Sequence, residues 1–458
     1  MENFYLSAIS PVDGRYHKTT SVLKNIFSEY AFLKLKVKIE IRWLQKLSKV
    51  SGIFELQKFD DFTNDALNNI IKNFNYNDAK EIKQIEHIIH HDTKAIEYFL
   101  KKKISKLIPK KKSMINFIHF SCTSDDINNL AYASMMKSTI FTVLLPYWEK
   151  IILVIKNMAI KFKNISMVSR THGQPATPTT LGKEMSNFYS RLILQSVNLK
   201  NTKIFGKING ATGNYNAHVV SYPDIDWEKV SESFVNDLGF TWNSCTTQIE
   251  PHDYISEILS CIIRFNTILI NLNQDIWGYI TLHYFNQKCS TNEVGSSTMP
   301  HKINPIHFEK SEGNLGLSNS IMNHMILKLP ISRWQRDLSD STVLRNLGVT
   351  ISYSIIAYDS ILFGLNKIQV NTINIEKDLK DQWQLLAEPI QMVMRRFGIN
   401  DAYEKLKQLT QNKNIDANQL HKYIDSLNIP SYEKNKLKKL TPINYIGNAV
   451  EIVNKICN

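Results

Sequence analysis

One long apolar stretch constrains the fold more than any other part of this chain. Between residues 252 and 287, apolar side chains recur every three or four positions. This spacing is typical of an α-helix, and an apolar surface this broad leaves no side of the helix for water. We therefore expect a helix buried between other helices, whose core positions are Ile255, Ile258, Leu259, Ile262, Ile263, Phe265, Ile268, Leu269, Leu272, Ile276 and Ile280.

The same spacing predicts helices in five further stretches, at about 21–50, 126–162, 179–204, 308–328 and 345–365. Pro146 lies near the middle of one of them and should kink or divide it. Alternating strands are scarce, and Val219-Val220-Ser221-Tyr222 is the candidate. The sequence therefore predicts an all-α fold, a scaffold of long parallel and antiparallel helices with polar loops at their ends.

Two positions suggest domain boundaries. A lysine-rich run, Lys101-Lys102-Lys103 through Lys110-Lys111-Lys112, precedes the first, and Gly364-Leu365-Asn366-Lys367 closes a helix at the second. These positions predict an N-terminal helical domain (1–112), a central long-helix bundle with the polar loops (113–366) and a C-terminal helical domain (367–458).

Composition narrows the class of protein. The chain is 43% hydrophobic and 21% charged, as soluble globular proteins are, and no stretch of 18 residues is both apolar and uncharged. Neither a membrane span nor a secretory signal is therefore expected. The five cysteines are scattered without metal-ligand spacing, which argues against a disulfide framework or zinc site and favours a reducing cytoplasm.

The net charge of +13 is the one unusual feature of the composition. It is compatible with nucleic acid, a membrane surface or anionic small molecules as partners. The lysines are spread along the chain, so charge alone does not indicate nucleic-acid binding.

A polar loop at Gly295–Pro305 carries the strongest functional signal. Glycine followed by small hydroxyl residues makes a loop whose backbone N–H groups can turn toward an anion, and Lys302 adds positive charge. The loop thus looks suited to hold a carboxylate and to place a serine against it. Either Ser296 or Ser297 could be that serine.

Three other polar segments lie at predicted helix ends. Ser169–Pro178 presents His172 away from any packed apolar face, and histidine suits proton transfer near neutral pH. Ser121–Asn129 would cap a helix beginning near residue 126, and a helix N-terminus also attracts anions. In the third segment His90 and His91 are adjacent, so they cannot form a two-histidine metal site on one helix face.

Together these strings resemble the adenylosuccinate lyase family of the fumarase/aspartase superfamily. The Gly295–Pro305 loop, the Thr171–Thr177 segment (Thr-His-Gly-Gln-Pro-Ala-Thr), the Thr123-Ser124 pair and the His91-Asp92 pair carry the resemblance. Ser10-Pro11-Val12-Asp13-Gly14-Arg15-Tyr16 is similar to the opening segment of a bacterial subgroup. The matches occur in the family's order and cover nearly the full length.

The resemblance implies a cytoplasmic carbon–nitrogen lyase of purine nucleotide biosynthesis. Such an enzyme releases fumarate by β-elimination from adenylosuccinate, giving AMP, and from succinylaminoimidazole-carboxamide ribotide, giving the aminoimidazole-carboxamide ribotide. The resemblance also implies a homotetramer whose active sites are shared between subunits. It implies small-molecule substrates, neither cofactor nor metal, and neither nucleic acid nor membrane as a partner.

By the same resemblance, Ser296 is the general base and His172 the general acid. His91 assists at the leaving group, Lys302 and Asn304 donate to the developing carboxylate dianion, and Glu309 orients the histidine. His90 and Thr93 depart from the family pattern. The implied substrate-binding residues are Arg15, Tyr16, His90, His91, Asp92, Thr123, Ser124, Gln248, Lys302, Asn304, Arg336, Ser341, Thr342 and Arg345.

Three alternatives remain at this point. Another fumarate-releasing lyase of the superfamily, such as argininosuccinate lyase, would keep the Gly295–Pro305 loop without the segment around Arg15. A catalytically silent relative should have lost His172 or the serine. A nucleic-acid-binding protein would explain the charge but not a glycine/serine loop combined with distant histidine motifs.

Overall fold

The computed structural model describes residues 4–109, 112–288, 297–411 and 415–457. The chain forms two compact units. The first comprises Met1–Tyr147, Gln195–Thr267 and Gly313–Ala357, and the second comprises Trp148–Leu194, Ile268–Glu312 and Tyr358–Asn458. The three domains expected from the sequence, with boundaries near 112 and 366, stay a prediction.

Long helices dominate both units and confirm the all-α prediction. The apolar stretch at 252–287 forms α12, which ends at Thr281, and Ile258, Ile262, Leu269 and Ile276 on it are fully buried. The long helices are α8 (Leu145–Lys161), α9 (Leu181–Asn201), α12 (Asp253–Thr281), α13 (Ile306–Lys328) and α15 (Leu347–Lys367).

Buried polar side chains join these long helices inside each unit, three of them in the first unit and two in the second. In the first unit, Asn266 of α12 donates to Ser354 of α15 at 3.0 Å, and Ser318 of α13 donates to a carbonyl of α15 at 2.8 Å. In the second, Asn273 of α12 donates to Ser311 of α13 at 3.0 Å. Small side chains at these crossings satisfy one another without water, so the helices can approach closely.

The predicted break near Pro146 is confirmed as a turn of π-helix. α7 (Ser124–Ser138) passes through the π-helical segment η3 (Thr139–Leu144) into α8. Proline has no backbone N–H and its ring crowds the carbonyl four residues earlier, so the chain widens by one residue per turn just before Pro146.

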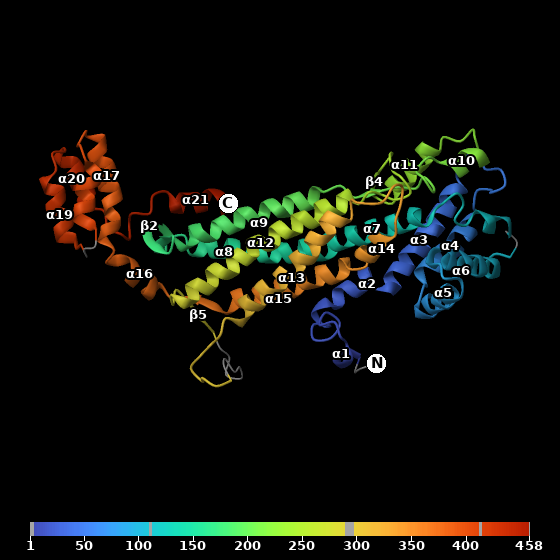
Figure 1. Cartoon of the computed structure of the whole chain (residues 1–458), viewed down its shortest axis with the longest axis horizontal. Helices are drawn as coiled ribbons and strands as arrows, with labels where there is room; N and C mark the ends of the chain where they lie inside the picture. The colour runs from blue at the N-terminus through green and yellow to red at the C-terminus, as the bar shows by residue number, and fades with distance from the viewer. Residues whose placement is uncertain (1–3, 110–111, 289–296, 412–414, 458) are drawn as a thin grey trace. The chain divides into compact units, whose positions relative to one another are not determined.

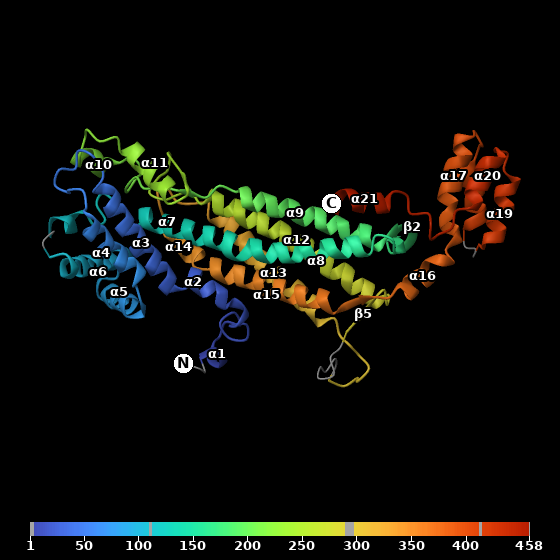
Figure 2. The same ribbon diagram turned by 180° about the vertical axis from the view of Figure 1, so that it is seen from behind.

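The first unit contains the N-terminal helices. Ser28 caps α3 by accepting from the Ala31 N–H at 3.2 Å, and α3 packs with α4, α5 and α6 (Figure 1, Figure 2). The remaining elements of this unit are α1 (Phe4–Ser7), η1 (Thr19–Leu23), α2 (Lys24–Phe27), α3 (Glu29–Leu47), α4 (Asp61–Lys72), α5 (Tyr76–Ile89), α6 (Asp92–Leu107), η2 (Lys112–Phe117), β3 (Phe205–Gly206), α10 (Asn216–Ser221), α11 (Trp227–Asp237), β4 (Thr241–Trp242) and α14 (Ser339–Leu344).

The strand expected at Val219–Tyr222 was wrong. Residues 216–221 form the short helix α10, in which Ser221 donates back to the carbonyl of Ala217. Neighbouring valines favour a strand locally, but His218 on this turn is fully buried among aromatic rings, and that burial decides the conformation.

The second unit ends in a small cluster of C-terminal helices. Leu386, Ile390, Met394, Leu406 and Ile424 form its apolar core, and Figures 1 and 2 show α17, α19 and α20 gathered there. Besides its parts of the long helices, this unit contains β1 (Ser166–Thr171), β2 (Gln174–Thr180), β5 (Phe285–Gln287), β6 (Ile368–Val370), α16 (Thr372–Lys380), η4 (Trp383–Leu386), α17 (Ala387–Arg396), α18 (Ala402–Thr410), α19 (Ala417–Ser426), α20 (Ser431–Lys438) and α21 (Ala449–Cys457).

Among the described residues, three helical segments are long and apolar enough to cross a membrane by length and composition alone: Ser124–Lys161, Asp253–Thr281 and Ser339–Lys367. The protein itself buries 50%, 56% and 67% of their most apolar windows. At least half of each apolar surface therefore already packs inside the fold.

Candidate active site

The structure divides the predicted site residues between the two units. Ser296, the expected base, lies outside the described residues. The second unit holds His172, Lys302, Asn304 and Glu309. The first unit holds the others, namely Arg15, Tyr16, His90, His91, Asp92, Thr123, Ser124, Gln248, Arg336, Ser341, Thr342 and Arg345.

His91 caps the N-terminus of α6. Its Nδ1 accepts the backbone N–H of Lys94 at 3.1 Å, so the neutral ring carries its proton on Nε2. The side chain is 54% exposed, which leaves Nε2–H available to a ligand. His90, just before it, ends α5 in the left-handed conformation (φ 55).

Asp92 is held by a lysine that the sequence reading did not find. Lys36 Nζ lies 2.5 Å from Asp92 Oδ2, and the lysine side chain is 1% exposed. Burial alone would raise the pKa of the Asp92 carboxyl, but the Lys36 ammonium lowers it to about 2. Asp92 therefore stays ionised and fixes the start of α6, where His91 sits.

Thr123 and Ser124 lie at the N-terminus of α7, which begins at Ser124, two residues before the expected start near 126. Asp126, inside the first turn, accepts the backbone N–H groups of Thr123 at 2.8 Å, Asn209 at 3.0 Å and Gly210 at 3.1 Å. Its carboxylate also pairs with Lys207 at 2.9 Å. One buried carboxylate thus ties this anion-attracting helix end to a second loop.

That second loop, Asn209–Tyr215, was missed by the sequence reading. Its signal was the turn-rich string Asn-Gly-Ala-Thr-Gly-Asn. Gly213 has φ +80, and a Cβ there would lie 2.3 Å from the carbonyl oxygen of Thr246. Asn209 also donates to Thr246 Oγ1 at 2.9 Å. These contacts place the half-buried Gln248 segment beside the start of α7.

The two predicted arginines of the region around α14 are each paired with a carboxylate. Arg336 lies 3.3 Å from the buried Asp125, next to Asp126, and Arg345 lies 3.4 Å from Glu29. Burial raises the pKa of the Asp125 carboxyl, although Lys207, His252 and Arg336 lower it. Ser341 and Thr342 lie on α14 between the arginines.

The N-terminal segment meets Arg345 in a small cavity. Asp13, Lys24 and Arg345 are among the residues that line a space of about 210 Å³. The exposed Arg15 guanidinium lies 6.0 Å from the centre of the Tyr16 ring. Lys24 and Arg345 are the cations in the lining of this cavity, and a cation of this kind can bind an anionic group such as phosphate.

In the second unit, His172 stands at the tip of a β-hairpin rather than in an irregular loop, which corrects the expected connection between two helices. β1 and β2 pair antiparallel, with Thr171 opposite Gln174. His172 (φ 52) and Gly173 (φ 75) therefore form the two-residue turn, and both have the positive φ that a type I′ turn requires. The ring is exposed and makes no hydrogen bond to any residue that the structure describes.

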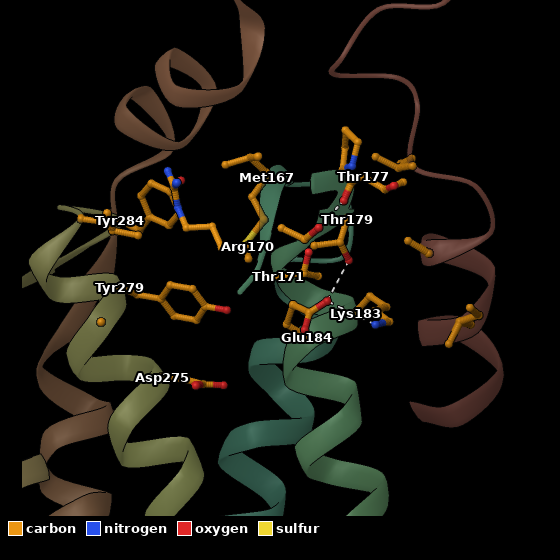
Figure 3. Close-up of a pocket in the computed structure, with 18 of the residues that line it drawn as sticks. Met167, Arg170, Thr171, Thr177, Thr179, Lys183, Glu184, Asp275, Tyr279 and Tyr284 are labelled. Carbon is orange, nitrogen blue, oxygen red and sulfur yellow. Dashed lines mark hydrogen bonds and ion pairs between the residues drawn. The ribbon is translucent and has the colours of Figure 1, made fainter. Parts of the chain in front are cut away.

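A cavity of about 710 Å³ lies beside this hairpin (Figure 3). Tyr279 and Asp275 of α12 point across it toward Glu184 of α9, which bonds Thr179 at 2.9 Å and Lys183 at 3.2 Å. Burial, and then the Glu184 charge, raise the pKa of the Asp275 carboxyl. Thr171, next to His172, also lines the cavity.

Lys302 and Asn304 belong to the described end of the predicted loop. Lys302 is exposed, and its backbone N–H donates to the Met299 carbonyl at 3.0 Å. Glu309, in the first turn of α13, accepts from Trp277 at 3.2 Å and makes no described contact with His172. Among the residues that the structure describes, no three His, Cys, Asp or Glu side chains converge as a metal site would require.

The chain is similar to known proteins over almost its full length. Residues 14–317 match a family model described as Lyase, and residues 332–446 match one described as Adenylosuccinate lyase C-terminal. Adenylosuccinate lyases of Buchnera aphidicola (subspecies Acyrthosiphon pisum, strain APS) and Escherichia coli K12 are 55% and 54% identical, each over 100% of both chains. That of Haemophilus influenzae is 53% identical over 98% of this chain and 99% of its own.

Solved structures show the same fold. A fumarate lyase from Mesorhizobium sp. BNC1 superposes with a TM-score of 0.74 at 15% identity, covering 95% of this chain and 97% of its own. A 3-carboxy-cis,cis-muconate lactonizing enzyme from Pseudomonas putida superposes with a TM-score of 0.72 at 18% identity, covering 95% and 96%. The two family models and the full-length relatives at more than 50% identity show that this chain belongs to the adenylosuccinate lyase family.

Proposed function

We propose that this protein is an adenylosuccinate lyase. It releases fumarate by β-elimination from adenylosuccinate, giving AMP, and from succinylaminoimidazole-carboxamide ribotide. The observation that carries the proposal is the 53–55% identity to bacterial adenylosuccinate lyases over essentially the full length of both chains. The C-terminal family model favours this reaction over that of argininosuccinate lyase.

The elimination needs a base, an acid and donors to a carboxylate. The base removes a proton from the succinyl carbon beside a carboxylate, and the acid protonates the departing nitrogen. We assign the acid to His172, whose ring is exposed and makes no hydrogen bond to a residue in the part of the chain that the structure describes, and the base to Ser296. Lys302 and Asn304 stabilise the aci-carboxylate, and Glu309 orients the histidine.

The first unit supplies substrate binding in this proposal. The N-terminus of α7, with Thr123 and Ser124, attracts a succinyl carboxylate because the aligned backbone dipoles give a helix N-terminus partial positive charge. Arg15, Tyr16 and Arg345 hold the nucleotide phosphate, and His91 donates through Nε2–H at the leaving group. The remaining assigned contacts are His90, Asp92, Gln248, Arg336, Ser341 and Thr342.

We further propose a homotetramer with sites shared between subunits. The long helices leave large apolar side chains exposed, and apolar patches on such helices are typical of interfaces. These side chains are Leu153 and Ile160 of α8, Ile193, Leu194 and Val197 of α9, Trp277 of α12, Leu317 and Leu327 of α13, and Phe363 of α15.

A cytoplasmic location completes the proposal. Cys122, Cys245, Cys261 and Cys457 are all free thiols, as a reducing compartment would keep them. The partners we assign are small-molecule substrates only, without cofactor, metal, nucleic acid or membrane.

An absorbance assay for fumarate release tests the reaction directly. The purified protein should release fumarate from both succinyl purine substrates and not from argininosuccinate. Turnover of argininosuccinate with neither succinyl purine consumed would overturn the assignment.

A further inference from the structure

The hairpin that carries His172 lacks some of the hydrogen bonds that usually stabilise paired strands. Pro175, opposite Arg170 in the pairing, and Pro178 have no N–H to donate between the strands. The register also shifts between Met167 and Ser169. A two-stranded ribbon is at best marginally stable by itself. Something else must therefore hold its tip in one place.

Two carboxylates from the C-terminal helices hold the two strands of this hairpin. Arg170 Nη2 of β1, two residues before His172, lies 2.5 Å from Asp378 Oδ2 of α16. Thr177 Oγ1 of β2 donates to Glu388 Oε2 of α17 at 2.5 Å. Each strand thus has its own anchor, contributed from about 210 residues further along the chain.

A tyrosine holds each carboxylate in turn. The Tyr284 hydroxyl donates to the same Asp378 oxygen that binds Arg170. Burial, and then the Asp378 carboxylate, raise the pKa of Tyr284 to about 12. Burial and the Glu388 carboxylate likewise raise the pKa of Tyr445 to about 12. Each carboxylate therefore has a tyrosine partner in addition to its contact with the hairpin.

Asp378 is the stronger of the two anchors. It receives a charged guanidinium and a phenol at one oxygen, and both its side chain and that of Arg170 are only 30% exposed. A charge-assisted pair of this kind is shorter and stronger than a neutral hydrogen bond. Glu388 receives a threonine hydroxyl, which carries no charge.

We propose that Asp378, through Arg170 and held by Tyr284, is a positioning residue for the reaction: it fixes the hairpin that presents His172 to the departing nitrogen. The inference rests on the proposed function of His172 as general acid. Asp378 touches neither substrate nor proton in this scheme. It acts by keeping the acid where the reaction needs it.

The kinetic test is Asp378→Asn, which keeps the shape of the side chain and removes its charge. Because a displacement of about 1 Å at a catalytic group can cost about 10²-fold in rate, we expect kcat for fumarate release to fall by about 10- to 100-fold. KM should stay within about threefold, since binding is assigned to other residues. Tyr284→Phe should likewise lower kcat while leaving KM nearly unchanged, but its decrease in kcat should be smaller.

The matched control is Asp425→Asn, which breaks a salt bridge to Lys438 in the same C-terminal region without touching the hairpin. It should leave kcat within about twofold, as exposed pairs contribute little. A double variant sharpens the test. If Arg170→Gln and Asp378→Asn act through one contact, the combined variant should be no slower than the slower single variant. Fully multiplied losses would overturn the shared anchor.

Hydrogen exchange gives a readout that does not depend on catalysis. Amide exchange in a peptide spanning residues 166–180 should be faster in Asp378→Asn than in the parent or in Asp425→Asn, because the hairpin opens more often. Unchanged exchange together with an unchanged kcat would overturn the inference. If His172→Gln stayed fully active, the acid assignment would fail, and the exchange result would still decide whether Asp378 holds the hairpin.

Discussion

Lys207 and Asp126 form an ion pair 2.9 Å long in which both side chains are completely buried. Asp126 also accepts three backbone N–H groups, from Thr123, Asn209 and Gly210. These bonds compensate the cost of removing the carboxylate from water. The pair therefore acts as the fixed point on which the α7 N-terminus and the Asn209–Tyr215 loop are built.

Asp126→Asn should be strongly destabilising. It leaves the Lys207 ammonium buried without a counter-charge, and breaking a buried pair in this way costs about 3–5 kcal/mol. Urea unfolding at fixed protein concentration measures the change. Lys102→Gln, which removes an exposed pair with Glu81, is the control and should cost about 0–1 kcal/mol. Equal losses in the two variants would contradict the role of Asp126.

Ser296→Ala tests the proposed base. Turnover should fall by several orders of magnitude, while binding of a succinyl purine nucleotide, measured by calorimetry, stays nearly unchanged. Ser297→Ala is the matched control, because the sequence alone leaves the two hydroxyls open. If the Ser297 variant is the slower of the two, the base is reassigned to Ser297.

His172→Gln tests the proposed acid. General acid–base catalysis contributes about 10²–10⁴ in rate, so the variant should keep less than about a tenth of the parent kcat. Single-turnover fumarate release measures the chemical step directly. Activity above that level would argue that another group protonates the departing nitrogen.

The buried His218 should make stability depend on pH. Burial lowers its pKa from 6.5 to about 4, although the Asp126 charge raises it, and neither ring nitrogen has a hydrogen-bond partner among the described residues. The depressed value means that the folded state holds His218 neutral while the unfolded chain takes up a proton below pH 6.5. Its contribution is complete above pH 6.5 and is lost as pH falls toward 4.

The size of this effect follows from the shift. Each pH unit in that window should lower the unfolding free energy by up to about 1.4 kcal/mol, or about 3 kcal/mol in all. His218→Asn should reduce the pH dependence of the unfolding free energy between pH 6.5 and pH 4 by the amount that corresponds to the uptake of about one proton on unfolding. Unfolding titrations at several pH values provide the measurement, with the exposed His324→Asn as control. An identical slope in the His218 variant would refute the prediction.

Gly213→Ala should be more harmful than an ordinary glycine substitution. Gly213 and Gly398 both have positive φ, and alanine there costs about 1–2 kcal/mol. Only at Gly213 would the new Cβ meet a backbone oxygen, at 2.3 Å, whereas nothing lies within 4 Å at Gly398. Thermal unfolding should therefore separate the two variants. Similar melting temperatures for the Gly213→Ala and Gly398→Ala variants would contradict this difference in stability. Gly213→Ala should also raise KM, because Thr246 would be displaced and Gln248 lies two residues after it.

The helices could be predicted because their signal is local. The apolar spacing around Ile258 and Ile262 predicts the helix α12, and Pro146 predicts the break that the structure shows as a π-helical turn between α7 and α8. The hairpin at His172 was missed because its strands carry prolines and hydroxyl residues rather than an alternating apolar pattern. The strand expected at Val219 and Val220 was a helix because its conformation depends on burying His218 among aromatic rings elsewhere in the chain, which the local valine pattern does not show.

By itself, the sequence determined the fold class and the polar motifs on which the family assignment depends. Both signals are local, because helical periodicity and short motifs each involve residues that are close together in the sequence. Only the tertiary structure decided which groups those motifs meet. Asp126 reaches Asn209, and Arg170 reaches Asp378, across separations of 83 and 208 residues. No spacing rule predicts such pairs, because burial and packing, rather than sequence neighbours, select the partner of a charge.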